Sequence, residues 1–408
     1  MRAFWHLMLL AIFGRYISLV MAQQSPVLAS SSVMSFWEKQ QWFADADVLV
    51  AGGGLLGLWT AIELKKLQPG LEIVVVEQHA VPMGASTRNA GFACFGSASE
   101  VLSDIALAGL EKTKALIDQR WQGIQKIAGC FSADAIDLKW CGGYECLSEA
   151  GANDTVNQLE FLNRLLAETI GSEAVYREVE HPVASFGLKH FGAIIQNPYE
   201  GVLHSGKYVR CLMQKARDMG VRLLHGARIQ TVESNEHGAL VISKRGSWRC
   251  RSVVHTTNAA LAKDFPQMGF RPGRGQMMLV NMDKPCETAG AWHASSGFYY
   301  WRSLHGKLLI GGGRQTDFEG EETFSLDNTA AILQHLSQYI GEHFAGKIVS
   351  IEHAWAGTMA FTPDKQPVCC EIAKNQWIAM CCNGMGVALS PVFAEIVAAK
   401  IVATLNLA

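Results

Sequence analysis

Short apolar runs alternate with longer stretches of helical spacing along the first part of the chain. Residues 47–51 form an apolar run with the length of a buried parallel strand. Residues 55–67 follow with the spacing of a helix that stops before Pro69-Gly70, and residues 71–76 form a second apolar run. A strand, a helix and a strand in about thirty residues predict a βαβ unit and therefore a parallel sheet.

The rest of the chain continues this alternation without an internal repeat or an obvious linker. At 408 residues, two domains are expected, and the chain is expected to cross between them more than once. We predict an α/β fold in which a Rossmann-like domain interleaves with a mixed-sheet domain. The first is assigned residues 34–130, 197–265 and 346–408, and the second residues 131–196 and 266–345. The pattern predicts helices over 100–129, 154–170, 206–219, 326–344 and 386–405, and strands over 140–147, 221–225, 276–281 and 298–302.

The turn after the first predicted strand carries a glycine motif of the form GxGxxG. Its glycines allow a tight turn, a close approach of the backbone to a pyrophosphate, and close packing of helix on strand. The start of the helix offers free N–H groups to phosphates, and an acidic residue at the end of the second strand would bind ribose hydroxyls. The pattern predicts a dinucleotide site formed by Gly52, Gly54, Leu55, Leu56, Gly57, Glu77 and Gln78.

Two further segments favour FAD over NAD as the dinucleotide. Residues 84–92 form a small, hydroxyl-rich loop that suits the extended pyrophosphate and ribityl chain. Residues 382–387 precede the last predicted helix, whose N–H groups can stabilise the negative charge that reduction places on a flavin. We therefore predict FAD, held without a covalent bond. The residues assigned to it in these segments are Ser86, Thr87, Arg88, Asn89, Gly91, Gly384, Met385, Gly386 and Val387.

Charge and cysteine usage narrow the classes of partner. The net charge of −2 gives no electrostatic reason to expect nucleic acid or an anionic membrane surface as a partner. The eleven cysteines follow no zinc-like spacing, so we predict no metal site. Free thiols in a reducing compartment fit this composition best.

The first residues leave two interpretations open. Residues 1–22 resemble a signal peptide, with an early arginine, an apolar run and a small residue at the end. The alternative is that translation begins at Met34 and that residues 1–33 are an artefact or a disordered extension. The second interpretation predicts a cytoplasmic protein and the first an exported one.

Several segments together resemble the FAD-dependent amine and amino-acid oxidoreductases, a family that includes D-amino-acid oxidase, glycine oxidase and sarcosine oxidase. The resemblance covers residues 40–405, and the γ-glutamylputrescine oxidase-like branch is the most similar. It implies a glutathione-reductase-like two-domain architecture, with FAD in the first domain and the substrate in the second. It also implies that Ile229 contacts the adenine and that Asn258 lies in a loop closing over FAD. The segments that carry it are residues 35–39, 48–77, 86–91, 253–259, 274–276, 311–314, 355–359 and 383–386.

The resemblance implies a reaction as well as a fold. A small-molecule amine or amino acid would lose a hydride from its C–N carbon to flavin N5, and the imine would hydrolyse to a carbonyl. Oxygen or another acceptor would then take the electrons. Two alternatives remain open: a dehydrogenase that passes electrons to a carrier other than oxygen, and a flavin-binding subunit without chemistry of its own. The sequence does not indicate an oligomeric state.

The substrate side departs from the family's amino-acid oxidases. They hold the substrate carboxylate with an arginine just ahead of the segment matching residues 362–364, where this chain has Met359. Tyr300 matches a substrate-facing tyrosine of D-amino-acid oxidase. On the predicted strand, Arg302 shares its face, and we expect it to replace the missing arginine. The alternative is an aromatic core strand with a surface arginine.

Overall fold

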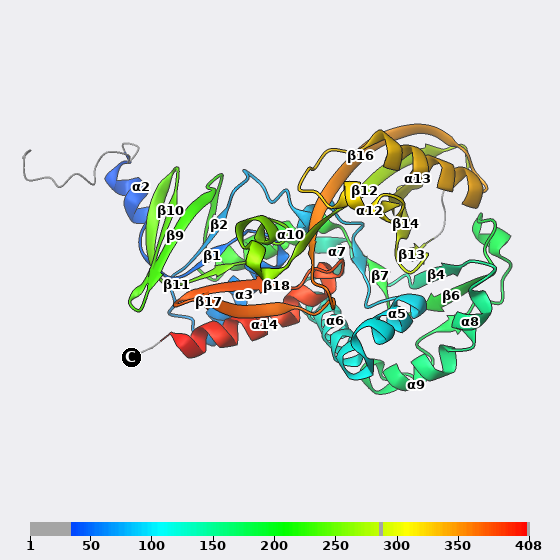
Figure 1. The fold of residues 1–408 in the computed structure, drawn as a ribbon, viewed down its shortest axis with the longest axis horizontal. Coiled ribbons are helices and arrows are strands. Elements are labelled where there is room, and N and C mark those ends of the chain that lie inside the picture. The colour runs from blue at the N-terminus through cyan, green and yellow to red at the C-terminus, as the bar shows by residue number, and fades with distance from the viewer. Residues whose placement is uncertain (1–33, 285–288, 406–408) are drawn as a thin grey trace, which may run out of the picture.

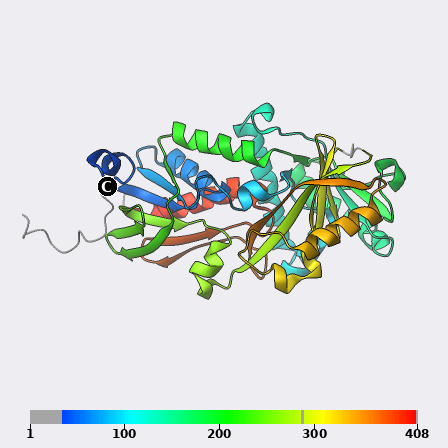
Figure 2. The same ribbon diagram turned by 90° about the horizontal axis from the view of Figure 1, so that it is seen from above.

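The computed structural model describes residues 34–284 and 289–405. Two eight-stranded sheets occupy the two halves of an elongated molecule (Figures 1 and 2). The mixed α/β architecture is the predicted one. Residues 1–33, on which the choice between a signal peptide and a start at Met34 depends, lie outside the described residues.

The first sheet is built around the predicted βαβ unit. Strands β1 (Ala46–Ala51) and β2 (Ile73–Glu77) pair in parallel and are joined by helix α3 (Leu55–Leu67). The sheet has the order β17-β18-β11-β1-β2-β8, and the β9–β10 hairpin extends from β11. All five residues of β2 are buried, because the strand is covered on both faces. The other strands of this sheet are β8 (Arg222–His225), β9 (Ile229–Asn235), β10 (Gly238–Ser243), β11 (Gly246–His255), β17 (Val368–Ala373) and β18 (Gln376–Met380).

The last helix packs against this half of the molecule. Helix α14 (Gly386–Thr404) contacts α3 and α6 (Leu110–Cys130). Among the described helices it alone is long and apolar enough to cross a membrane by length and composition, and 56% of that stretch is buried. Its contacts with α3 and α6 account for its apolar composition as core packing.

The second sheet extends beyond the residues assigned to the second domain. Its order is β16-β12-β15-β14-β13-β4-β6-β5, and α13 (Ala330–His343) packs on one face. Strand β16 (Ile348–Phe361) pairs with β12 along its length. The boundary expected at residue 346 therefore needs correction, because the second sheet continues to Phe361. The remaining strands are β4 (Gly143–Leu147), β5 (Arg177–Glu178), β6 (Ala193–Asn197), β12 (Arg271–Met282), β13 (Ala291–Ala294), β14 (Tyr299–Leu304) and β15 (Lys307–Gly312).

Two helices expected as single elements are interrupted. The stretch 100–129 forms α5 (Ala98–Ala108) and α6, because Gly109 has φ +88° and ends the first of them. The stretch 154–170 forms α8 (Ala152–Val156) and α9 (Leu159–Ile170). The other elements are α2 (Phe36–Gln41), α4 (Ala85–Arg88), α7 (Ala133–Ile136), α10 (Ser205–Asp218), α11 (Ala260–Asp264), α12 (Phe318–Glu321), β3 (Phe92–Ala93), β7 (Gly201–Val202), and the 3-10 turns η2 (Val183–Phe186), η3 (Pro266–Met268) and η4 (Arg314–Thr316).

Candidate cofactor and substrate site

One large cavity is lined by residues of both sheets. Its volume is about 1880 Å³, well above the ~300–1,000 Å³ of a typical small-molecule pocket. The lining runs from Gly52 at the end of β1 to Tyr300 on β14, and it includes the segment before α14. The cavity therefore has space for an extended dinucleotide and for a second small molecule beside it.

The glycine turn is closed by hydrogen bonds from neighbouring elements. Gly53 N donates to Glu77 Oε2 at 3.0 Å, and Leu55 N donates to Ser86 Oγ at 2.9 Å. A Cβ on Gly57 would lie 2.0 Å from the Gly52 carbonyl oxygen, so only glycine allows α3 to pack this closely on the turn. The N–H groups that follow Leu55 in the first turn of α3 have no intrahelical partner and are available to a phosphate.

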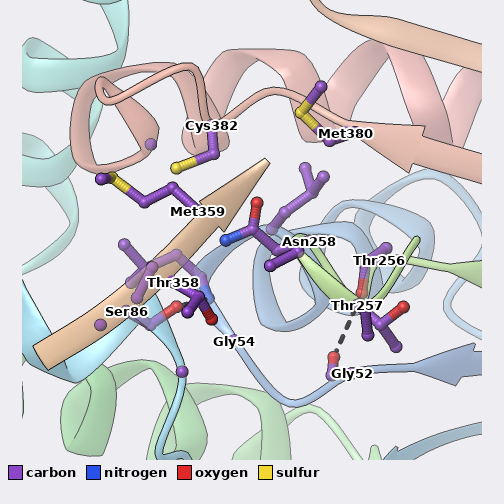
Figure 3. A pocket seen from close by; sticks show the side chains of 18 of the residues that line it. Gly52, Gly54, Ser86, Thr256, Thr257, Asn258, Thr358, Met359, Met380 and Cys382 are labelled. Carbon is purple, nitrogen blue, oxygen red and sulfur yellow. Dashed lines mark hydrogen bonds between the residues drawn. The ribbon is translucent and has the colours of Figure 1, made fainter. Parts of the chain in front are cut away.

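Polar groups around this turn fit FAD. Thr256 Oγ1 donates to the carbonyl oxygen of Ala51 at 2.9 Å. It also donates to that of Gly52 at 3.2 Å (Figure 3). Thr257 and Asn383 also line the cavity. Within the described chain, the Thr257 hydroxyl and the Asn383 amide nitrogen are buried without a hydrogen-bond partner. Such groups are costly when left unpaired, and the carbonyl, hydroxyl and phosphate groups of FAD are chemically suited to pair with them.

The loop after β2 is held by contacts with both halves of the molecule. Asn89 Nδ2 donates to the Ala85 carbonyl at 2.9 Å, and Asn89 Oδ1 accepts from Ser205 Oγ at 2.7 Å. Arg88 Nη1 donates to the Ala356 carbonyl on β16 at 2.5 Å. The loop thus joins the first sheet, α10 and the second sheet beside the cavity.

Most of the predicted site residues line this one cavity. Asn258 accepts a hydrogen bond from Ala360 N at 3.0 Å and has φ +52°, in the left-handed region that asparagine tolerates. The predicted residues that line the cavity are Gly52, Gly54, Leu55, Leu56, Glu77, Gln78, Ser86, Arg88, Asn89, Ile229, Asn258, Tyr300, Gly384, Met385, Gly386 and Val387.

Four predicted residues do not line the cavity. Gly57 packs against Gly52, and Thr87 Oγ1 donates to the Pro82 carbonyl at 2.7 Å. The Gly91 carbonyl accepts from Leu203 N at 2.7 Å, which fixes the end of the loop formed by residues 84–92, called the FAD loop below. These three residues shape the site from outside it. Arg302, the fourth, is described below.

The wall opposite the glycine turn is formed by one face of the second sheet. Tyr300, Met359 and Phe361 line the cavity from β14 and β16. Burial raises the pKa of Tyr300 to about 12, so its hydroxyl stays protonated at neutral pH. The hydroxyl has no hydrogen-bond partner in the described part of the chain. It can therefore donate a hydrogen bond to a bound molecule.

Arg302 requires a correction to the sequence-based expectation. It shares a face with Tyr300, as the strand alternation predicts, but it is buried outside the cavity. Its Nη1 donates to the carbonyl oxygens of Gly91 and Leu203, at 3.2 and 2.9 Å. Its side chain neither lines the cavity nor lies on the surface. It ties β14 to the FAD loop.

Some cavity residues were not assigned from the sequence. Thr256 and Thr257 lie in the segment 253–259, and Arg314 follows the glycines at 311–313. Both segments carried the resemblance, but their side chains were given no role. Cys382, which Figure 3 labels together with Met359 and Met380, also lines the cavity. Cys94 is buried, with its Sγ 3.9 Å from Met385 Sδ, and burial raises the pKa of its thiol well above the usual value.

Comparison with known proteins identifies the family. A family model described as FAD dependent oxidoreductase matches residues 47–400. The chain belongs to this family. A probable oxidoreductase, OrdL, of Rhizobium meliloti is 25% identical over 361 residues, which cover 85% of this chain and 80% of the relative. The gamma-glutamylputrescine oxidoreductase of Escherichia coli is 21% identical, over 86% of this chain and 82% of that protein.

Solved structures with the same fold include enzymes that act on amino acids. Glycine oxidase from Geobacillus kaustophilus superposes with a TM-score of 0.67 at 20% identity, covering 90% of this chain and 96% of that one. L-proline dehydrogenase from P. horikoshii superposes with a TM-score of 0.65 at 19% identity, covering 88% and 93%. This protein is thus an FAD-dependent oxidoreductase with the two-domain fold of these enzymes.

Proposed function

We propose that this oxidoreductase oxidises the C–N bond of an amine or amino acid. The observation that carries the proposal is the continuity of one cavity from the glycine turn of β1 to the Tyr300 wall of the second sheet. A small molecule against this wall would lie beside the cofactor. When bound, FAD would accept the hydride that leaves the α-carbon of the neutral amine, and water would hydrolyse the resulting iminium ion to a carbonyl compound and a free amine or ammonia.

The protein's own residues would bind and orient the substrate and the flavin. Met359 and Phe361 form apolar surface that keeps water from the reacting carbon. Tyr300 can donate one hydrogen bond to the substrate. The start of α14, at Gly386, brings the partial positive charge of a helix N-terminus to the cavity, where it would stabilise negative charge on the reduced flavin. We assign no residue as a general base.

The first test identifies the cofactor and its attachment. We expect purified protein to be yellow and to release FAD, rather than FMN, when the chain is denatured by acid or heat. Colour that stays on the denatured chain would contradict non-covalent binding. A colourless protein that takes up no flavin would contradict the site assignment.

The second test identifies the reaction. The holoenzyme is mixed without oxygen with a panel of amines and amino acids, and bleaching of the flavin absorbance is followed together with formation of a carbonyl product. Bleaching with a stoichiometric carbonyl is the expected result. Admitting air to the reduced enzyme then distinguishes an oxidase from a dehydrogenase. An oxidase forms hydrogen peroxide, whereas a dehydrogenase reduces only an added dye. Holoenzyme that dithionite reduces but no amine bleaches would favour a flavin-binding subunit without chemistry of its own.

A further inference from the structure

Three phenylalanine rings lie around one arginine of the cavity wall. Arg314 begins η4, directly after β15, and lines the cavity. Its guanidinium carbon lies 4.2 Å from the ring centre of Phe361, 5.6 Å from that of Phe298 and 5.7 Å from that of Phe318. We call these four residues the arginine box. A guanidinium stacked on aromatic rings keeps the N–H groups at its edge free for acceptors in its own plane.

The donors of Arg314 have no acceptor in the described protein. No carboxylate of the described residues lies within ion-pairing distance of its guanidinium, and it donates no hydrogen bond. Glu321, a nearby acid, is already paired with Arg274, whose Nη2 lies 2.6 Å from Glu321 Oε1. Burial lowers the pKa of Arg314, but arginine stays charged in proteins. The cavity therefore contains a partly desolvated cation whose donors are unused.

The backbone beneath the box leaves room for this arrangement. A Cβ on Gly273 of β12 would lie 2.6 Å from Phe361 Cε2 and 2.9 Å from Arg314 Nη1. Any larger residue there would displace the ring or the guanidinium. Tyr300 lies close enough to Arg314 for each to affect the pKa of the other. The free hydroxyl and the free guanidinium thus belong to the same end of the cavity.

We propose that the arginine box binds the carboxylate of the substrate, so that the enzyme acts on acidic amines such as amino acids or carboxyalkylamines. A planar guanidinium can hold a carboxylate through two parallel hydrogen bonds. Phe324 and Leu326 also line the cavity and offer apolar surface for the carbon chain. The arginine comes from η4, not from the position of Met359. The inference rests on the proposed oxidation of a C–N bond, but it concerns binding and can be tested without turnover.

The test measures binding of carboxylates to the oxidised holoenzyme. Benzoate and pentanoate, each with its neutral amide as a matched control, are titrated by calorimetry and by the change in flavin absorbance. We expect both acids to bind more tightly than their amides. Arg314→Met should weaken the binding of the acids by at least about 30-fold, equivalent to about 2 kcal/mol, and should change that of the amides little. Arg314→Lys, which keeps the charge but loses the planar fork, should fall between them.

Two further variants show whether a change in affinity comes from a local contact, from long-range charge or from misfolding. Arg271→Met removes an equal charge from an arginine with 77% of its side chain exposed, and it should leave the affinities unchanged. Gly273→Ala keeps the charge but crowds the arginine box. It should weaken the binding of the acids and change that of the amides little. Should Arg314→Met fail to retain FAD, the Lys and Gly273 variants decide the result.

Two outcomes would overturn the proposal: wild-type enzyme without preference for the acids, or Arg314 variants that retain FAD and bind the acids as before. Acid binding without bleaching by any amine would instead count against the proposed oxidation and leave the arginine box in place.

Discussion

Glu200 is an acid held in the protein interior without a cation. It is 1% exposed, and its Oε1 accepts hydrogen bonds from Phe95 N at 2.8 Å and Gly96 N at 3.2 Å. Within the described ranges it forms no salt bridge. Burial raises its pKa to about 8 and that of nearby Glu145 to about 7. At neutral pH the folded protein therefore holds protons on these side chains that the unfolded chain would have released.

This proton uptake predicts how stability depends on pH. Between pH 5 and pH 8 the folded state binds more protons than the unfolded state, in which Glu200 titrates near 4.5. Its contribution to stability therefore falls as pH rises, by at most about 1.4 kcal/mol per pH unit for one proton. Glu200→Gln imitates the protonated acid, so we expect the variant to gain stability relative to wild type across this range.

Unfolding of the two holoenzymes by urea at pH 5, 6, 7 and 8 measures the difference. Glu160→Gln, at a side chain 81% exposed, is the control and should show no trend. A constant difference between Glu200→Gln and wild type would mean that Glu200 is ionised in the folded protein throughout.

At the scale of elements, the sequence predicts those features whose determinants lie close together in the chain. The β1–α3–β2 unit and its glycine turn were recognised because all their determinants lie within about thirty residues. Strand alternation also placed Tyr300 and Arg302 on one face of β14. It could not show what that face meets, because Gly91 and Leu203 come from distant parts of the chain. For the same reason residues 346–361 were assigned to the first domain, although β16 pairs with β12 of the second sheet, about seventy residues earlier in the chain. Arg314 was missed because its chemistry depends on three phenylalanines from separate elements.

The position of Arg302 predicts a structural phenotype. Arg302→Met removes the donor that joins β14 to the FAD loop and to the residue after β7. The loss of two buried hydrogen bonds from a charged donor should cost about 1–3 kcal/mol of stability. We expect a lower Tm and faster loss of FAD on dilution or dialysis, with the affinities for benzoate and benzamide reduced alike in the enzyme that still holds FAD. Selective loss of benzoate binding, with normal FAD retention, would restore the earlier expectation that Arg302 meets a carboxylate.

At the scale of the whole molecule, the cavity depends on both halves of the fold. The dinucleotide end comes from the first sheet, and Tyr300 and the arginine box come from the second. A ligand bound across both sheets stabilises the folded molecule by mass action. The ten cysteines of the described residues are free thiols.

The first described residues are held by contacts with other described residues. Ser35 caps α2 by accepting a hydrogen bond from Glu38 N at 3.1 Å, and Phe43 stacks on Trp248 with ring centres 4.9 Å apart. Among the described residues, those that line the cavity all follow Val50 in the chain. We therefore expect a chain shortened to begin at Met34 to accumulate in the cytoplasm, bind FAD and match the Tm of the longer form. Thermal unfolding of the two forms, with and without added FAD, provides the comparison. A shortened chain that cannot retain FAD, or a natural mature chain that starts at Gln23 outside the cytoplasm, would support the exported alternative, because in either case residues 1–33 would have a role in folding or export.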